Sequence, residues 1–328
     1  MATRGEHRRT KRAAACAVLV ALLSSASCSV EKLALKKVAG MMTSPGSGGV
    51  FTQDNDPELV GDALPFAIKL YETLLTSIPD HEGLRLVTGS LYITYANAFI
   101  QTPADITPKR DLETREFLFR RAKNLYLRGR DILLVHLERK NPALLDQLKN
   151  RQYREALAVF GRQDAGFLYW TALGWVGAFG ADPFDMKFGL TLPQAAPLME
   201  RVHQVDPGYD PAAVELFYIY YYGSLPEYMG GDLKKAREHF ERAKTVSGET
   251  NTSHLVALAV TVCVKEQNAA EFRDLLSQVL KFDADRLPDN RLVNVLNRRK
   301  AKWLLDNIDD YFIELDGNSD PAGREDIQ

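Results

Sequence analysis

Four tyrosines crowd one short segment of this sequence, and their side chains suit ligand binding better than catalysis. They are Tyr218, Tyr220, Tyr221 and Tyr222. At 3.6 residues per helical turn they cannot all face one neighbouring helix, so some should face a cavity or the next helix pair. Because a tyrosine ring is flat and apolar and carries one hydroxyl, it suits a cavity for an amphipathic small molecule. Stacking between helix pairs explains the same pattern.

Residues 89–101 form an apolar segment that carries several polar side chains. Tyr92, Tyr95, Asn97 and Gln101 are the candidates for ligand contacts in this segment. Buried polar groups need hydrogen-bond partners. These side chains therefore either bond to neighbouring backbone or converge on a ligand.

Residues 165–181 contain no charged side chain but include Trp170 and Trp175. A membrane span is possible at the lower length limit, but the internal glycines favour a buried helix that lines a cavity. Core packing is the simpler interpretation for Trp170. Trp175 is the better ligand candidate of the two.

Cys28 is a candidate for lipid attachment. The order of residues before it is typical of an export signal: a basic cluster, an apolar run over 13–23, and then Ser24, Ser25, Ala26 and Ser27. The pattern resembles a bacterial lipobox, in which the cysteine thiol receives diacylglycerol, although Ser25 stands where leucine is usual. We expect a lipid anchor on Cys28 and a location in the periplasm. The alternative is an ordinary signal peptide in which Cys28 has no role.

Motifs for catalysis, metal binding and nucleic-acid binding are missing from the sequence. There is no phosphate loop, dinucleotide glycine pattern, nucleophile elbow or zinc helix motif, and no histidine pair has metal-ligand spacing. The formal net charge of -2 comes without a basic stripe, which argues against nucleic acid as a partner. We expect no enzyme activity, no cofactor and no metal. An exported hydrolase would need carboxylates around His136 or His203.

The elements that must position these residues are helices. From Pro57 onward the apolar spacing is helical, so we predict an all-α domain. Small and aromatic residues recur at tetratricopeptide-like spacing, as in Ala236, Phe240 and Ala243. The pattern predicts a tetratricopeptide-like bundle of about four helix pairs plus a C-terminal capping helix over 290–313.

The sequence pattern divides the chain into four parts. We predict a signal peptide over 1–27 and a lipidated cysteine with a flexible tether over 28–56, because the tether contains a Gly and Ser rich run. The helical domain is predicted over 57–315, and residues 316–328 are predicted to form a disordered tail.

The sequence resembles the TatT family, the periplasmic lipoprotein T components of TRAP (tripartite ATP-independent periplasmic) transporters. The resemblance covers about residues 51–312 and rests on five segments: 56–60, 63–69, 95–101, 223–240 and 294–305. It implies a homotrimer of helix-pair bundles with a cavity in each subunit. The implied partner is the solute-binding P component, which delivers small organic acids or apolar-tailed ligands to a permease.

The candidate ligand segments contain no arginine, although a tightly held carboxylate usually meets a guanidinium. We therefore expect a loosely held, largely apolar ligand, and an arginine in the cavity would contradict this expectation. The alternative function is a tetratricopeptide scaffold for cell-envelope assembly without a transport role.

Overall fold

The computed structural model describes residues 35–44, 46, 48–247 and 250–313, and these contain helices and connecting turns but no strand. The prediction of an all-α protein is confirmed. The signal peptide, Cys28 and the predicted tail over 316–328 lie outside the described residues. None of the described helices combines the length and the apolar character needed to cross a bilayer.

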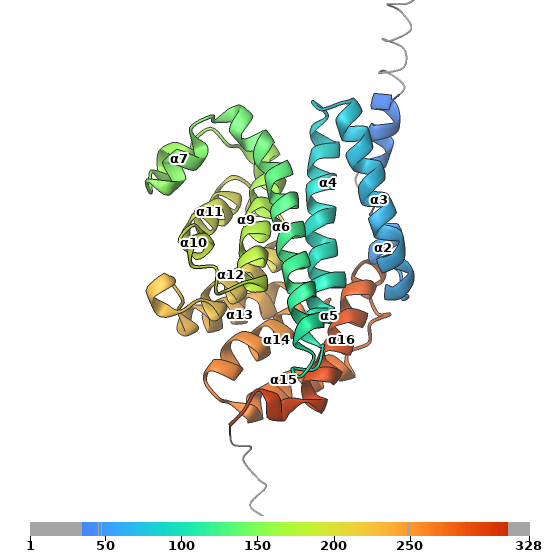
Figure 1. Ribbon diagram of the computed structural model, residues 1–328, viewed down its shortest axis with the longest axis vertical. Helices are drawn as coiled ribbons and strands as arrows, with labels where there is room; N and C mark the ends of the chain where they lie inside the picture. Colours follow the sequence, from blue (N-terminus) through green and yellow to red (C-terminus); the bar gives the residue numbers. More distant parts are fainter. Residues whose placement is uncertain (1–34, 45, 47, 248–249, 314–328) are drawn as a thin grey trace, which may run out of the picture.

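Five helices of the first half pack side by side in chain order (Figure 1). They are α3 (Pro57–Ser77), α4 (Glu82–Tyr95), α6 (Leu112–Lys140), α9 (Ala165–Ala181) and α11 (Ala195–Val205). Short helices connect them: α5 (Thr102–Asp105), α7 (Leu144–Lys149), α8 (Tyr153–Leu157) and α10 (Met186–Gly189). The uncharged α9 lies between α6 and α11, and most of its side chains are buried, as the core interpretation of this segment predicts.

The second half is a further set of packed helices. It comprises α12 (Pro211–Ser224), α13 (Leu233–Ser247), α14 (Ser253–Leu258), α15 (Ala269–Lys281) and α16 (Arg291–Asp306). α12 packs on α13, α14 packs on both, and α15 joins α14 to α16. Two stretches are π-helical, Ala96–Gln101 after α4 and Ala259–Cys263 after α14.

Side-chain caps determine where several of these helices begin. Asp56 accepts a hydrogen bond from the Leu59 amide (3.0 Å) at the start of α3, and Asp210 accepts one from the Ala213 amide (3.1 Å) at the start of α12. Each cap satisfies an amide that has no partner inside the helix. Proline follows both caps, and its fixed φ suits the first helical position.

Glycine permits the close approach of α4 and α6. A Cβ atom added to Gly129 would lie 2.6 Å from the Gly89 carbonyl oxygen. The two backbones are therefore almost in contact at this crossing. Small residues at a helix crossing, here Gly89 and Gly129, permit this close packing.

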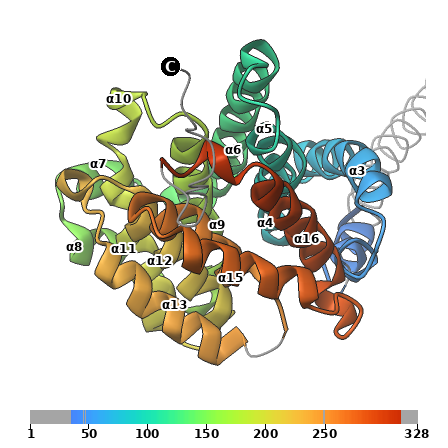
Figure 2. The ribbon, with the colours of Figure 1, turned by 90° about the horizontal axis from the view of Figure 1, so that it is seen from below.

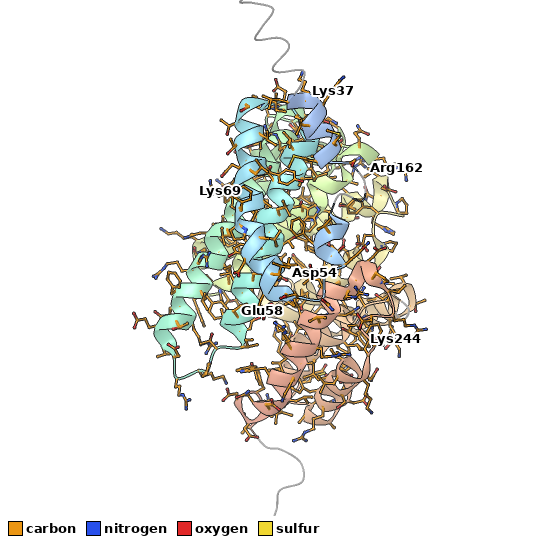
Figure 3. All side chains as sticks on the ribbon, turned by 90° about the vertical axis from the view of Figure 1, so that its right-hand side faces the viewer. Lys37, Asp54, Glu58, Lys69, Arg162 and Lys244 are labelled. Atoms are coloured by element: carbon orange, nitrogen blue, oxygen red, sulfur yellow. The ribbon has the colours of Figure 1, made fainter. Side chains whose placement is uncertain are left out.

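The two ends of the helical array meet, because α16 contacts both α3 and α2 (Gly49–Thr52). Arg299 forms an ion pair with Glu58, and Leu292 belongs to one apolar cluster with Val60 and Leu64. Figure 2 shows α16 between α15 and α3, and Figure 3 shows Glu58 on the blue helix beside the red one. The last long helix thereby closes the array against the first.

Packed structure begins before the boundary predicted at Pro57. Residues 35–42 are helical, and Ala39 is fully buried against Leu75, Ile78 and Leu84. The Tyr71 hydroxyl also donates a hydrogen bond to the Met42 carbonyl (2.9 Å). Part of the predicted tether is therefore attached to α3 and α4.

Helices occur where the repeat pattern predicted them, and α9 packs on α11 and α12 packs on α13 as two helix pairs. The predicted capping helix corresponds to α16, which ends at Asp306. Whether these pairs repeat with tetratricopeptide geometry stays a prediction.

Candidate ligand pocket

A pocket of about 350 Å³ lies between α6, α7, α9 and the segment that carries α10. Its walls are mainly apolar and include Leu127, Leu134, Leu145, Trp175 and Phe188. Its polar lining residues are Arg130, Asp146, Lys149, Thr191 and Gln194. Trp175 was predicted to line a ligand cavity, and the structure places it in this pocket.

Arg130 gives the pocket a positive charge beside its aromatic wall. Its guanidinium carbon lies 5.0 Å from the centre of the Trp175 ring and 5.7 Å from that of Phe188. The side chain is 16% exposed, and it donates hydrogen bonds to the neighbouring Asp131 carboxylate (2.9 and 2.7 Å). The sequence offered no reason to expect an arginine in the ligand cavity, but Arg130 lines this pocket. It was missed because it lies on α6, outside the candidate ligand segments.

Hydrogen bonds fix the aromatic wall in place. The Trp175 indole N–H donates to the Thr191 hydroxyl (2.9 Å), which donates to the Phe188 carbonyl (2.7 Å). Phe188 is also fixed through its amide, which donates to the Asp185 carboxylate (3.0 Å) at the start of α10. The rings of Trp175 and Phe188 are thus positioned through Thr191 and Asp185.

Lys123 attaches the α10 segment to α6. Its ammonium group lies 2.8 Å from Asp182 and 2.7 Å from Asp185. The hydrogen bond from Lys123 is the main reason why the pKa of Asp185 lies below its usual value. The Asp185 carboxylate therefore stays ionised at neutral pH, and the two ion pairs of Lys123 keep the segment beside the pocket.

The combination of walls and charges favours one class of ligand. Aromatic and aliphatic walls can cover an apolar chain, while Arg130 and Lys149 offer two cationic groups against the single carboxylate of Asp146. A guanidinium can bind a carboxylate through two parallel hydrogen bonds. The pocket therefore fits a small organic anion with an apolar tail.

Asn97 and Gln101 converge on a protein side chain. Asn97 Nδ2 lies 3.1 Å from the Tyr126 hydroxyl, which in turn donates to Gln101 Oε1 (2.6 Å). Tyr126 is buried, and α6 brings it against the π-helical turn that carries both amides. The partner predicted from sequence was backbone or ligand, and the structure supplies a tyrosine from a distant helix.

Tyr92 and Tyr95 contact charged residues on the α3 and α6 side of α4. The buried Tyr92 hydroxyl accepts from Lys69 (3.2 Å) and donates to Glu72 (3.1 Å). Tyr95 stacks on Phe99, with ring centres 5.9 Å apart, and the Arg121 guanidinium lies 5.8 Å from its ring. Their roles in ligand binding stay predictions.

The tyrosine cluster is divided between two surroundings. Tyr218 and Tyr222 stack on each other and on His239 of α13, with ring centres 4.4 Å apart for Tyr218 and His239. Tyr221 is buried against Phe217 in the main core. Tyr218 and Tyr222 thus stack on the other helix of their own pair, and Tyr221 stacks within α12, so stacking between helix pairs and a ligand cavity both stay interpretations.

Trp170 packs against Tyr169, with perpendicular rings 5.3 Å apart, in the main core. Among the predicted ligand residues, Trp175 alone lines the 350 Å³ pocket. Sequence reasoning missed Arg130 and Lys149. Their only sequence signal is a position on α6 or α7, which gives no indication of what they face.

Carboxylates do surround His136, the arrangement that a hydrolase would require. His136 Nε2 lies 2.8 Å from Asp164, and Nδ1 lies 3.6 Å from Glu82. However, Asp164 is fully buried, and it also accepts two hydrogen bonds from Lys140, each 2.8 Å long. The cluster binds α6 to the start of α9 and does not line the pocket. In the described part of the chain, no group of His, Cys, Asp and Glu could hold a metal ion.

Comparison with known proteins agrees with the sequence resemblance. The profile of the TRAP transporter T-component family matches residues 53–312. An uncharacterized protein of Treponema pallidum (strain Nichols) is 31% identical over 314 residues, which cover 91% of this chain and 97% of that protein. The match extends over nearly all of the helical domain, so the chain belongs to the TRAP transporter T-component family.

Proposed function

We propose that this protein is a non-catalytic periplasmic lipoprotein that docks the substrate-binding P component of a TRAP transporter. In this proposal it receives a small, largely apolar organic acid from that receptor. Family membership supports the transport role. The single observation that carries the ligand proposal is the apolar pocket in which Arg130 lies over Trp175.

The ligand class follows from the lining of the pocket. Trp175, Phe188 and the leucines would cover a chain of several carbons, and Arg130 with Lys149 would bind its carboxylate. A ligand with a carboxylate should therefore bind more tightly than an uncharged ligand of the same length. Octanoate is a suitable probe, and octanol is its matched uncharged control.

A docking surface for the receptor adjoins the pocket. Phe184, Met186 and Leu190 of the α10 segment are 91%, 61% and 80% exposed, and Tyr228 on the next connection is 78% exposed. These two connections lie close together, since a Cβ on Gly189 would be 3.0 Å from Met229 Cε. Exposed apolar groups of this kind mark interaction sites. Docking here would place the mouth of the receptor beside Phe188, which lines the pocket.

The first experiment is affinity purification of the detergent-solubilised, lipid-anchored protein from its own cells, with mass spectrometry of the bound proteins. We expect a periplasmic solute receptor. A double variant, Phe184→Ser with Leu190→Ser, should lose it. Phe66→Ser is the matched control, because Phe66 is 74% exposed on α3. Recovery of the receptor by the double variant at the wild-type level would reject this surface.

The alternative function is a tetratricopeptide scaffold for cell-envelope assembly. In that case the same purification would recover envelope-assembly proteins without a solute receptor, and octanoate would not bind. The homotrimer is part of the main proposal, and sedimentation of the purified protein tests it by its mass. Mass spectrometry of the N-terminal peptide tests acylation of Cys28.

A further inference from the structure

A short helix over residues 35–42, the N-terminal helix, begins close to Cys28 in the chain. Leu35 follows Cys28 by seven residues, and an extended chain spans at most about 3.6 Å per residue, so Leu35 lies within about 25 Å of Cys28. A lipid on Cys28 would enter a bilayer and hold Cys28 at its surface. Our inference rests on that proposed lipid anchor, which would keep the N-terminal helix near the membrane.

The N-terminal helix packs on one end of the helical array, where α3 ends and α4 begins. Ala39 is fully buried among side chains of α3 and α4, and a Cβ atom added to Gly83 of α4 would lie 2.8 Å from Thr43 Oγ1. This end is at the top of Figure 1, and Lys37 stands at the top of Figure 3. The 29 residues of α6 span about 44 Å from the far end of the array. The end that carries the N-terminal helix is therefore the one that Cys28 brings to a bilayer.

The outward face of the N-terminal helix combines positive charge with apolar side chains. Lys36 and Lys37 are exposed, and they are the only charged residues among the described residues from 35 to 53. Val38 and Met41 are 41% and 68% exposed. Helices that bind at a membrane surface carry lysines on a polar face and insert neighbouring apolar side chains. The exposed residues of this helix have that composition.

The neighbouring charges leave the two lysines available to a partner outside the protein. Asp80 and Glu82 stand where α3 joins α4, and each has a basic side chain beside it. Asp80 lies 3.1 Å from Arg139, and Glu82 lies 3.6 Å from His136. Within the described part of the chain, neither lysine of the N-terminal helix forms an ion pair. Lysines held at the surface of an anionic membrane are attracted to it.

We propose that the N-terminal helix is a contact surface for a bilayer that contains anionic phospholipid. Lys36 and Lys37 would bind lipid phosphate groups, and Val38 and Met41 would enter the boundary between headgroups and acyl chains. Figures 1 and 2 both place the α10 segment on the opposite side of the array from the N-terminal helix. The receptor surface proposed on the α10 segment would therefore stay open while the N-terminal helix contacts the membrane.

Hydrogen exchange of the full mature chain on vesicles tests this contact. The unacylated chain is coupled through the Cys28 thiol to a maleimide lipid, because Cys263 is fully buried and does not compete. Phosphatidylcholine vesicles with about 30% phosphatidylglycerol are compared with pure phosphatidylcholine vesicles. We expect amides of residues 35–42 to exchange at least about five-fold more slowly on the anionic vesicles, because bound lipid opposes local opening of the helix. Amides at the start of α6 are the internal control and should exchange equally on both.

The double variant Lys36→Gln with Lys37→Gln should lose this slowing. Lys234→Gln with Lys235→Gln is the matched control, because it removes two adjacent exposed lysines from the start of α13. Circular dichroism melts establish that both variants are folded. Equal exchange of residues 35–42 on the two kinds of vesicle, or undiminished slowing in the Lys36 and Lys37 variant, would overturn the proposal. Acylation of Cys28 is measured separately, so failure of the anchor and failure of the lipid contact are distinguishable.

Discussion

The guanidinium of Arg130 lies 5.0 Å from the centre of the Trp175 ring, although the two residues belong to different helices. Each side chain gives the pocket something the other lacks, since Trp175 supplies a flat apolar surface and Arg130 supplies charge and hydrogen-bond donors. Asp131 accepts from two guanidinium nitrogens on one side, which orients the group. A carboxylate ligand would compete with Asp131 or share the guanidinium with it.

Replacing Arg130 tests whether this charge binds ligand. We expect Arg130→Met to weaken octanoate binding by about ten-fold or more, because a hydrogen bond to a charged group contributes about 1.5–3 kcal/mol. Octanol binding should change little. Calorimetric titration gives both affinities. Arg120→Met is the control, because Arg120 is exposed on the same helix and does not line the pocket. Equal losses for octanoate and octanol would assign Arg130 a packing role.

The His136 and Asp164 pair should make stability depend on pH. Burial raises the pKa of Asp164, but hydrogen bonds from Lys140, His136 and the Gly161 amide outweigh burial, and the net pKa lies below its usual value. A carboxyl group with a lowered folded pKa stabilises the protein above its unfolded pKa of about 4, and this stabilisation is lost as pH falls through the folded pKa.

We therefore expect Asp164→Asn to cost about 3–5 kcal/mol at pH 7, because it leaves Lys140 without its buried partner. Urea unfolding from pH 7 to pH 3 should give a flatter pH profile for this variant than for the wild type. Asp309→Asn is the exposed control and should keep the wild-type profile. Parallel profiles for wild type and Asp164→Asn would show that the pair does not contribute.

The crossing of α4 and α6 should not tolerate a methyl group. Gly129→Ala would bring Cβ to 2.6 Å from the Gly89 carbonyl oxygen, so the helices must separate, at a cost of about 1–3 kcal/mol. Gly180→Ala is the matched control in α9, where the nearest neighbour of an added Cβ would be 3.6 Å away. Its free energy of unfolding should rise by up to about 1 kcal/mol, because alanine has a higher helix propensity than glycine. Urea unfolding measures the stability of both variants. A Gly129→Ala protein as stable as the wild type would indicate that α4 and α6 are less closely packed at this crossing.

Apolar packing should hold the ends of the array together more strongly than the ion pair does. Glu58→Gln removes the exposed pair with Arg299 and should cost less than about 1 kcal/mol. Leu292→Ala removes a side chain packed with Val60 and Leu64 and should cost about 2–4 kcal/mol. Urea unfolding of the two variants gives the comparison. A larger loss of stability for Glu58→Gln than for Leu292→Ala would show that the ion pair dominates the contact.

The helices could be predicted from sequence because the signals that determine them are local. Apolar residues recur at helical spacing along one face, and caps such as Asp56 and Asp210 stand beside the amides that they bind. The packing of Ala39 could not be predicted in this way, because Ala39 gains its burial from α3 and α4 and not from its own neighbours.

The candidate site depended on contacts between distant residues. Trp175 was found because a tryptophan in an uncharged helix is unusual, whereas Arg130 is one of many charged residues on the long α6. The tyrosines of α12 drew attention by their number, yet two of them pack on His239. Residue type alone does not distinguish a ring that stacks on a neighbour from one that faces a ligand.

By itself, the sequence determined an all-helical domain of one transport-associated family, because helical periodicity and segment motifs are properties of consecutive residues. Only the tertiary structure decided which side chains meet. Arg130 reaches Trp175, Tyr126 reaches Asn97 and Gln101, and α16 closes against α3, because helix crossings bring together residues that the chain separates. Those crossings depend on the summed packing of whole helix faces, which no single motif encodes.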